Sequence, residues 1–311
     1  MILVTGATGC VGRAVVERLI SAGHAVKLLW HWNHEHPVPR RVTIIGGDVR
    51  QPETLKAAFT EEGDIDTVIH LASIRRESDT DAFDEVNIQG TQNVVQACRD
   101  HKVGRLITMS CLGAETRSPY PLHRSIGRAE EIARGSGLNF TVIKSAVVYG
   151  EGDWLTSWIT GMARSLPLVM PTPHSGQTKL QPIWVGDVAA CIVRSLSTRS
   201  TFRQVVPIGG PASMRLDEIM ATTLSATGRR RRLVRLPTSM THQLAGFVAR
   251  FRHALSEPEI EALAYNRTTE IGAVHRMFGF VPAKMGAKLD FLRPDALKPE
   301  LNVSLRGWPT A

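Results

Sequence analysis

The feature that most constrains this chain is a glycine pattern at its start. An apolar run at residues 2–4 leads into Gly6, Gly9 and Gly12, and a helix-forming stretch follows at 13–19. Gly6 allows a tight strand-to-helix turn, Gly9 lets the backbone approach a pyrophosphate, and Gly12 lets the helix pack closely on a sheet. The helix N-terminus offers N–H groups and a positive dipole end to phosphates. Since a strand pattern precedes the glycines and a helix pattern follows, the sequence predicts a dinucleotide-binding unit.

The first half of the chain alternates strand and helix patterns. We expect strands at 1–5, 25–30, 42–46, 66–70, 104–110 and 139–144. We expect helices at 11–22, 52–59, 84–101 and 123–135. This alternation predicts an α/β fold with a doubly wound parallel sheet and a ligand at the carboxyl ends of the strands.

The pattern changes after Gly150. A helix is expected at 154–166, a proline-containing connection after it, another helix from Asp187 to Leu196, and a strand at 205–208 that returns to the sheet. From Met214 onward the pattern is mostly helical. We therefore expect a dinucleotide-binding domain at 1–150, with a later return around 180–208. A smaller substrate or lid lobe is expected at 151–177 and 209–311.

Composition and charge narrow the class. The 311 residues, 43% of them apolar, can bury a full core. Much of the net charge of +8 lies in four arginines at 229–232, which fit either an anionic partner or the solvated start of a strand. Because no stacking aromatic or recognition helix lies beside them, we favour the solvated strand and expect no nucleic-acid partner.

The cysteines and the absence of a targeting pattern bear on location. Cys10, Cys98, Cys111 and Cys191 are widely spaced and show no zinc pattern. They fit reduced thiols of a cytoplasmic protein. Met1 leads straight into the first strand without a signal-peptide pattern, and no apolar segment is long enough to span a bilayer.

Several short motifs, taken in order, resemble one family. They are Thr5-Gly6-Ala7-Thr8-Gly9-Cys10-Val11-Gly12, Gly47-Asp48-Val49, His70-Leu71-Ala72-Ser73, Asn87-x-x-Gly90-Thr91-x-Asn93, Val148-Tyr149-Gly150 and Pro182-Ile183-Trp184-Val185-x-Asp187-Val188-Ala189. Together they resemble the extended and atypical short-chain dehydrogenases/reductases, which have a Rossmann-type fold. Phe278-Gly279-Phe280-Val281-Pro282 resembles the branch related to the nucleotide-binding accessory subunit of respiratory complex I.

The resemblance implies a set of cofactor contacts. The first loop would hold the pyrophosphate, the acid at 48 the adenine amino group, 71–73 the adenosine and ribose, and 146–148 the nicotinamide. The residues that this assigns are Gly6, Thr8, Gly9, Cys10, Val11, Gly12, Asp48, Val49, Leu71, Ala72, Ser73, Ala146 and Val148. Asp48 fits equally well as a turn or cap carboxylate ahead of the helix at Pro52.

The end of the second strand bears on the choice of cofactor. An acid there favours NAD, because it accepts from the ribose hydroxyls. Here no acid occurs until Glu35, and His31 stands where relatives often carry an arginine for the 2′-phosphate. We therefore expect NADP(H) to be favoured over NAD(H). Arginines that could assist are Arg13, Arg40 and Arg41. His31, His34 and His36 lie on a polar loop that would preorganise no ligand set, so no metal is expected.

The catalytic residues of the family are only partly matched. Its enzymes use a Tyr-x-x-x-Lys pair with a Ser or Thr, the tyrosine acting as acid or base beside the ammonium. Ser110 matches the serine, but alignment on Glu130 places Leu122 at the tyrosine and Ile126 at the lysine. Tyr120 and Arg124 have the right spacing two residues earlier, which rotates them by about 200° around a helix. Further pocket candidates are His123, Tyr149, Trp154 and Trp158.

Three functions remain open at this point. The first is an NADP(H)-binding atypical member with a degenerate pair, which reduces an unidentified small molecule or uses the nucleotide for structure or sensing. The second is a conventional sugar-nucleotide epimerase or hydroxysteroid-type dehydrogenase that works through Ser110, Tyr120 and Arg124. The third is an assembly module that docks on a membrane complex, for which the apolar stripe within 240–255 is the candidate surface. A homodimer is also compatible with the sequence.

Overall fold

The core of the protein is a parallel β-sheet. The structure is a computed structural model that describes residues 1–31, 41–60, 63–79, 81–166, 168–237, 257–261 and 263–293. Within these ranges seven strands pair in the order β11-β6-β5-β4-β1-β2-β3, each parallel to its neighbours. The strands are β1 (Ile2–Thr5), β2 (Val26–Trp30), β3 (Thr43–Gly46), β4 (Thr67–His70), β5 (Arg105–Cys111), β6 (Phe140–Ser145) and β11 (Gln204–Ile208).

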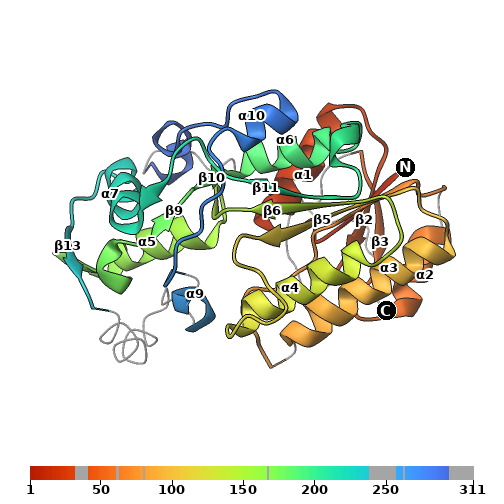
Figure 1. Ribbon diagram of the computed structural model, residues 1–311, viewed down its shortest axis with the longest axis horizontal. Coiled ribbons are helices and arrows are strands. Elements are labelled where there is room, and N and C mark those ends of the chain that lie inside the picture. The colour runs from red at the N-terminus through yellow and green to blue at the C-terminus, as the bar shows by residue number, and fades with distance from the viewer. Residues whose placement is uncertain are drawn as a thin grey trace, which may run out of the picture.

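Helices cover both faces of this sheet, as Figure 1 shows. One face carries α1 (Cys10–Ser21) and α6 (Val185–Arg194), and the other carries α2 (Pro52–Thr60), α3 (Gly90–Asp100) and α4 (Pro121–Arg134). A six-residue π-helix, Asp84–Gln89, leads directly into α3. Because both faces are covered, the inner strands are buried on both sides, which explains their nearly continuous apolar runs.

A second apolar core lies beyond the carboxyl ends of β6 and β11. It is built around α5 (Trp154–Ser165) and α7 (Leu216–Ala226). Short strands join it in pairs: β7 (Val148–Tyr149) with β10 (Ile183–Trp184), β9 (Lys179–Leu180) with β12 (Met214–Arg215), and β8 (Val169–Thr172) with β13 (Arg232–Arg235). The remaining elements are α9 (Glu257–Glu261), α10 (Ala273–Phe278) and 3-10 turns at Pro173–Gly176, Arg199–Thr201, Met285–Lys288 and Asp290–Leu292.

The strand order reverses direction beside β1, and the loops after β1 and β4 meet there. The Leu71 amide donates to the Thr5 carbonyl at 3.1 Å. Gly6 has a φ of +70°, and a Cβ on it would lie 2.4 Å from the Leu71 carbonyl carbon. A glycine is therefore required at this crossing, which is where doubly wound folds bind their ligands.

The expected fold class is confirmed, and the strands and helices of the first half lie within a residue or two of their expected bounds. Two details differ. The helix expected over 84–101 begins as a π-helix, and the region after Met214 contains β12 and β13 besides its helices. The apolar stripe within 240–255 lies outside the described residues. Within the described ranges, no helix combines the length and apolar character needed to cross a membrane.

Candidate functional site

The loop between β1 and α1 forms a backbone cradle. Gly9 is the N-cap of α1, no side chain caps the first turn, and that turn holds no acidic residue. A Cβ on Gly9 would meet only the Gly6 carbonyl oxygen, at an ordinary 3.5 Å, whereas a Cβ on Gly12 would lie 2.1 Å from the same oxygen. The cradle is therefore open at Gly9 and tightly packed at Gly12, and this fits a pyrophosphate held by helix N–H groups.

Asn87 organises the path expected for the adenosine and ribose. Its side-chain oxygen Oδ1 accepts from the Ser73 hydroxyl at 2.9 Å and from the Ile74 backbone amide at 2.8 Å. Its side-chain nitrogen Nδ2 donates to the Ile74 carbonyl at 3.2 Å and to the Ser125 hydroxyl at 3.0 Å. Asn87 thus fixes the segment after β4 to α4, which gives the Asn87-x-x-Gly90 motif a structural role.

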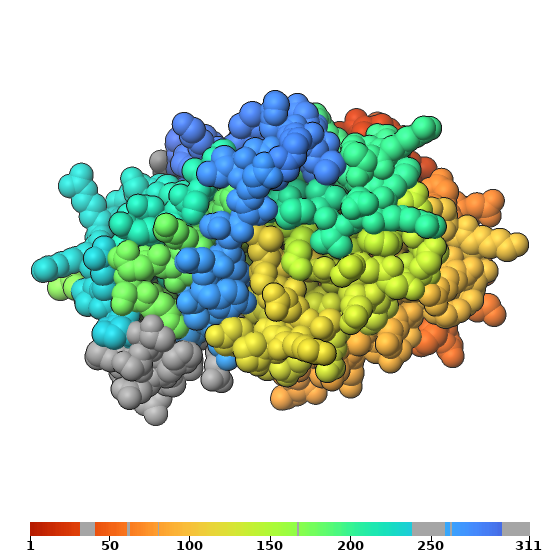
Figure 2. All heavy atoms as spheres, viewed as in Figure 1, coloured from red at the N-terminus to blue at the C-terminus, as the bar shows by residue number. Residues whose placement is uncertain are grey.

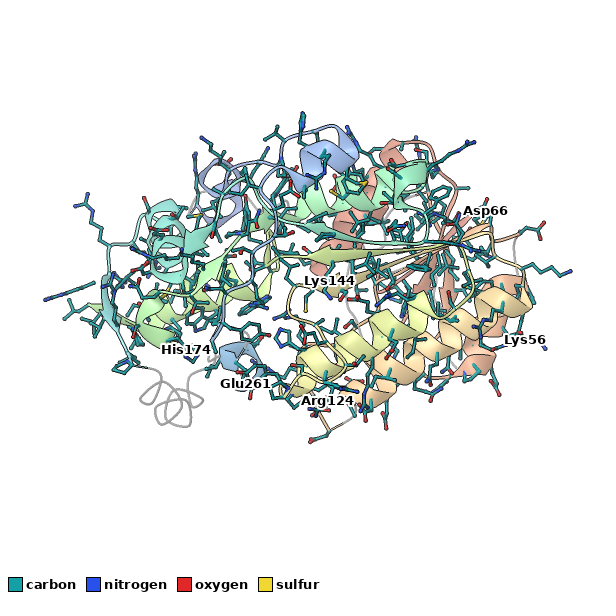
Figure 3. The ribbon with its side chains drawn as sticks, in the orientation of Figure 1. Lys56, Asp66, Arg124, Lys144, His174 and Glu261 are labelled. Carbon is teal, nitrogen blue, oxygen red and sulfur yellow. The ribbon has the colours of Figure 1, made fainter. Side chains whose placement is uncertain are left out.

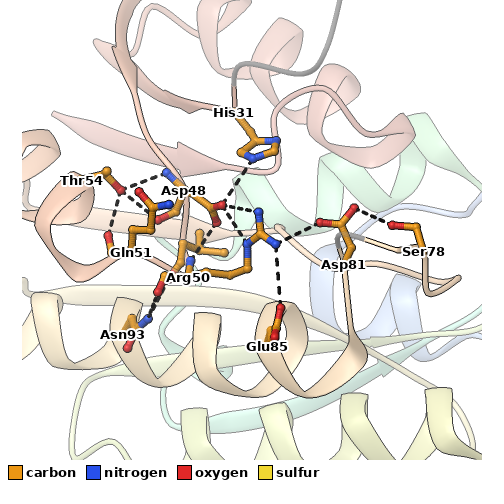
Figure 4. A network of polar contacts seen from close by, with 10 residues as sticks. His31, Asp48, Arg50, Gln51, Thr54, Ser78, Asp81, Glu85 and Asn93 are labelled. Carbon is orange, nitrogen blue, oxygen red and sulfur yellow. Dashed lines mark hydrogen bonds and ion pairs between the residues drawn. The ribbon is translucent and has the colours of Figure 1, made fainter.

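Asp48 lies in the charged network of Figure 4. The Arg50 side chain contacts its carboxylate at 2.6 and 2.8 Å, and the Arg50 amide donates to it at 2.9 Å. His31 Nε2 lies 3.4 Å from the same carboxylate, and Arg50 also pairs with Asp81 at 3.2 Å. Burial raises the pKa of Asp48, but the hydrogen bonds and charge of Arg50 outweigh it and hold that pKa below its ordinary value.

This geometry gives Asp48 the turn role that the sequence left open. Asn93 fastens the same turn from α3 by donating to the Val49 carbonyl at 2.9 Å. Arg50 was not singled out from the sequence. The aspartate itself is the signal for this turn, because its side chain accepts from the backbone amide two residues on. Arg13 lies elsewhere and donates to the Glu151 carbonyl at 3.1 Å. Glu35, His34, His36 and Arg40 lie outside the described residues.

Ser110 belongs to a polar group between the sheet and α4. Its hydroxyl donates to the Glu130 carboxylate at 2.6 Å, and Lys144 from β6 pairs with the same carboxylate at 3.0 Å. Lys144 also donates to the Ala114 carbonyl at 3.0 Å. Figure 3 shows Lys144 in the middle of the molecule, facing α4. At the end of the same strand, the Ala146 amide donates to the Ile208 carbonyl at 2.8 Å.

The two residues that align with the family's pair carry no proton-transfer group. In α4, Leu122 is fully buried about two turns before Glu130, and Ile126 is partly buried about one turn before it. Tyr120 is the N-cap of α4 and stacks on Tyr265 with ring centroids 5.5 Å apart. Arg124 donates to the Ser118 carbonyl at 3.0 Å, near the outer end of α4 (Figure 3).

The remaining pocket candidates divide between two places. Tyr149 and Trp158 are buried in the second core. His123 and Trp154 instead contact arginines, His123 with Arg267 at 3.3 Å and Trp154 under the Arg75 guanidinium at 4.5 Å. The sequence pattern had not indicated these two arginines, because neither belongs to a recognised motif.

The arginines at 229–232 lie where strand β13 begins. Arg229, Arg230 and Arg232 are exposed. Arg231 instead donates to the Leu166 carbonyl at 2.7 Å and the Ala163 carbonyl at 3.0 Å, both at the end of α5. This run therefore starts a strand and caps a helix, as the solvated-strand interpretation predicts.

Comparison with known proteins identifies the family of this chain. The model of the NAD dependent epimerase/dehydratase family matches residues 2–209. The chain belongs to this family, whose fold binds NAD(P). The resemblance to short-chain dehydrogenases/reductases, including the complex I branch, is confirmed.

Two proteins of known name are similar to this chain over most of its length. The chain is 26% identical to photosystem II assembly factor Ycf39 of Guillardia theta over 307 residues, which cover 90% of this chain and 89% of the relative. It is 27% identical over 256 residues to the mitochondrial NADH dehydrogenase (ubiquinone) 1 alpha subcomplex subunit 9 of Arabidopsis thaliana, covering 78% of this chain and 61% of that relative.

Solved structures share the fold. A nucleoside-diphosphate-sugar epimerase from Staphylococcus aureus superposes with a TM-score of 0.73 at 18% identity, over 93% of this chain and 99% of that one. A UDP-glucuronic acid 4-epimerase from Bacillus cereus, in complex with UDP-glucuronic acid and NAD, gives 0.71 at 18% identity, over 93% and 96%. At these identities the likeness establishes the fold alone.

Proposed function

We propose that this protein binds NADP(H) and uses it without a tyrosine–lysine proton relay. The observation that carries the proposal concerns which side chains lie along helix α4. Alignment on Glu130 assigns Leu122 and Ile126 to the two relay positions. In the structure Leu122 is buried, and Glu130 is held by Ser110 and Lys144, which supports this alignment. If so, these two positions offer no hydroxyl–ammonium pair to the nicotinamide, which argues against alcohol oxidation and sugar epimerisation.

The cofactor contacts in the proposal are those expected from the sequence. Backbone groups from Gly6 to Gly12 would hold the pyrophosphate, and Leu71 to Ser73 would line the adenosine path. The 2′-phosphate would lie at the end of β2, where His31 replaces an acid and Arg50 balances Asp48. Balanced in this way, Asp48 repels a phosphate less than a free carboxylate would, and this supports NADP(H).

The chemistry proposed is limited to what these residues can do. When bound, the reduced nicotinamide supplies a hydride. With no acid at the two relay positions, the favoured substrate is an acceptor that takes its proton from water, such as a quinone or flavin. If no acceptor reacts, the nucleotide serves structure or sensing, and the residues named here bind it without turnover.

The test compares wild type with Tyr120→Phe on any quinone, flavin or simple carbonyl that NADPH reduces. We expect the rate to change less than threefold, because Tyr120 stacks on Tyr265 and is not the acid. A general acid contributes about 10²–10⁴-fold, so its loss would be unmistakable. A hundredfold fall with unchanged stability would favour the conventional dehydrogenase or epimerase instead.

A second candidate function rests on the relatives. The Guillardia relative is named an assembly factor and the Arabidopsis relative a subunit of a larger complex, and each aligns over more than three quarters of this chain. We propose as the alternative that this chain assists assembly of a membrane complex. Native electrophoresis of cell extracts tests it, since a specific complex that survives Gly9→Asp would support assembly over catalysis.

A further inference from the structure

A cluster of polar side chains lies beside Ser110, where three distant parts of the chain meet. Arg75 follows β4, His123 lies in the first turn of α4, and Tyr265 and Arg267 follow α9. Tyr265 stacks on Tyr120, and Arg267 Nη1 lies 3.3 Å from His123 Nε2. Figure 2 shows the blue segment after α9 lying against the yellow surface of α4 and the loop before it.

This cluster holds several buried donors that have no partner. In Arg267, which is 7% exposed, Nε and Nη2 are both buried without a hydrogen bond. Arg75 Nε, His123 Nδ1 and the Tyr265 hydroxyl are in the same state. Buried polar groups are normally paired, so a group of unpaired donors in one place points to a ligand.

The protonation of His123 adds to this set of donors. An arginine only donates, so His123 Nε2 must accept from Arg267 and the ring hydrogen must sit on the unpartnered Nδ1. Burial, with the charges of Arg267 and Arg75, lowers the pKa of His123 from 6.5 to about 4. The ring is therefore neutral at neutral pH and offers its Nδ1 hydrogen.

The acidic groups around the cluster are engaged elsewhere. Glu259 pairs with Arg76 at 2.8 Å and Glu130 pairs with Lys144. Asp153 accepts from the Thr156 and Gly150 amides at 2.8 and 3.0 Å. Burial lowers the pKa of both Arg75 and Arg267, since neither has a carboxylate bonded to it among the described residues. Glu259 and Asp153 act on Arg75 only through their charge, without a hydrogen bond to it. Two buried guanidinium groups with no carboxylate bonded to them are costly unless an anion joins them.

We propose that Arg267 and Arg75 bind a small organic carboxylate. Nε and Nη2 lie on the same edge of a guanidinium and form the fork that accepts both oxygens of a carboxylate, and in Arg267 these are the two unpaired nitrogens. Arg75 Nε, His123 Nδ1 and the Tyr265 hydroxyl supply further donors. The site adjoins Ser110 through Cys111, whose pKa is influenced by both arginines and remains raised by burial. Its role as a substrate site rests on the proposed function, but the binding itself does not.

The experiment is a calorimetric and thermal-shift titration of the full chain with succinate, at constant ionic strength. Succinamide serves as the uncharged probe of the same shape and inorganic phosphate as the competing oxyanion. We expect saturable binding of succinate, weaker binding of phosphate and none of succinamide. Stronger binding of phosphate than of succinate would overturn the carboxylate assignment.

Two variants and a control decide whether Arg267 is responsible. Arg267→Lys keeps the buried charge but loses the fork, and Arg267→Met removes both. We expect succinate affinity to fall at least about tenfold in each, with cooperative unfolding retained. Arg230→Gln, which removes an exposed charge near β13, should bind as wild type does. Wild-type affinity in either Arg267 variant, or no saturable succinate binding by wild type, overturns the proposal.

Two further measurements separate this proposal from the proposed function. We expect Arg267→Met to leave the unliganded melting temperature unchanged or raised, because it removes an uncompensated buried charge. Succinate should also bind to Gly9→Asp and to wild type saturated with NADPH. If NADPH abolishes succinate binding, the arginines belong to the nucleotide site and the carboxylate site is refuted, while nucleotide binding stands.

Discussion

The Ser110 hydroxyl donates a 2.6 Å hydrogen bond to the Glu130 carboxylate, which Lys144 neutralises from the neighbouring strand at 3.0 Å. The serine expected to assist a catalytic tyrosine is thereby turned towards a carboxylate. Glu130 lies on α4 and Lys144 on β6, so the group also ties this helix to the sheet.

We predict that Glu130→Gln destabilises the protein by about 2 kcal/mol, because it leaves the Lys144 ammonium facing a neutral amide. Urea unfolding measures this directly. The matched control is Glu131→Gln, since Glu131 is the next residue of α4 and is exposed. The control should change the free energy of unfolding by at most about 0.5 kcal/mol. Equal effects would show that the Ser110–Glu130–Lys144 group contributes nothing.

Stability should fall as the pH falls from about 6.5 towards 4. Burial lowers the pKa of His70 from 6.5 to about 4, with the ring held between the Thr5 and Thr91 hydroxyls at 2.7 and 3.1 Å. Below pH 6.5 the His70 ring binds a proton in the unfolded chain but stays neutral in the folded chain, so the free energy of unfolding decreases. For His70 alone, the free energy of unfolding should decrease by about 2 kcal/mol between about pH 7 and pH 5.

Urea titrations at these two pH values check this prediction. His70→Gln should lose less stability on acidification than wild type does, although it is less stable at neutral pH. His24→Gln, which changes an exposed histidine, should keep the wild-type dependence. The same dependence in His70→Gln and wild type would contradict the account.

Two glycines of the cradle should differ in how much they matter for stability. Gly12→Ala should destabilise by at least about 2 kcal/mol, because its Cβ would overlap the Gly6 carbonyl oxygen. Gly9→Ala should fold as wild type does, because its Cβ meets only an ordinary contact. Thermal unfolding of the two variants compares them, and equal melting temperatures would show that the helix does not pack as described.

We predict that NADPH binds more tightly than NADH and that His31→Asp reverses this order. The new carboxylate would stand beside Asp48 and repel a 2′-phosphate, while it could accept from ribose hydroxyls. Titration of both nucleotides into both proteins measures the effect. Equal affinities of the wild type for NADPH and NADH would remove His31 as a selector.

Much of the fold could be predicted because it depends on local patterns. The buried strands read as short apolar runs, and Gly6 and Gly12 mark a turn and a close approach that few other residues permit. Helix α4 was expected at 123–135 and runs from Pro121 to Arg134, so it begins two residues earlier than expected. The assignment of Leu122 and Ile126 to the relay positions remains a prediction. The division into two lobes and the individual cofactor contacts remain predictions.

The rest of the site depends on contacts between distant residues. Arg75 and Arg267 lie far from each other and from His123 in the sequence, and only tertiary packing brings them together. In the same way, Ser110 and Glu130 were each identified by alignment, but their hydrogen bond depends on how α4 lies on β5. Sequence periodicity and motif spacing do not predict such contacts between distant residues.

The central claim is that the cradle between β1 and α1 holds NADP(H), and calorimetric titration with NADPH tests it most directly. Wild type and Gly9→Asp are titrated after circular dichroism has shown both to be folded. The account predicts saturable binding to wild type and none to Gly9→Asp, whose side chain and negative charge would occupy the place of the pyrophosphate. Unchanged affinity in Gly9→Asp, or no binding by the wild type, would contradict it.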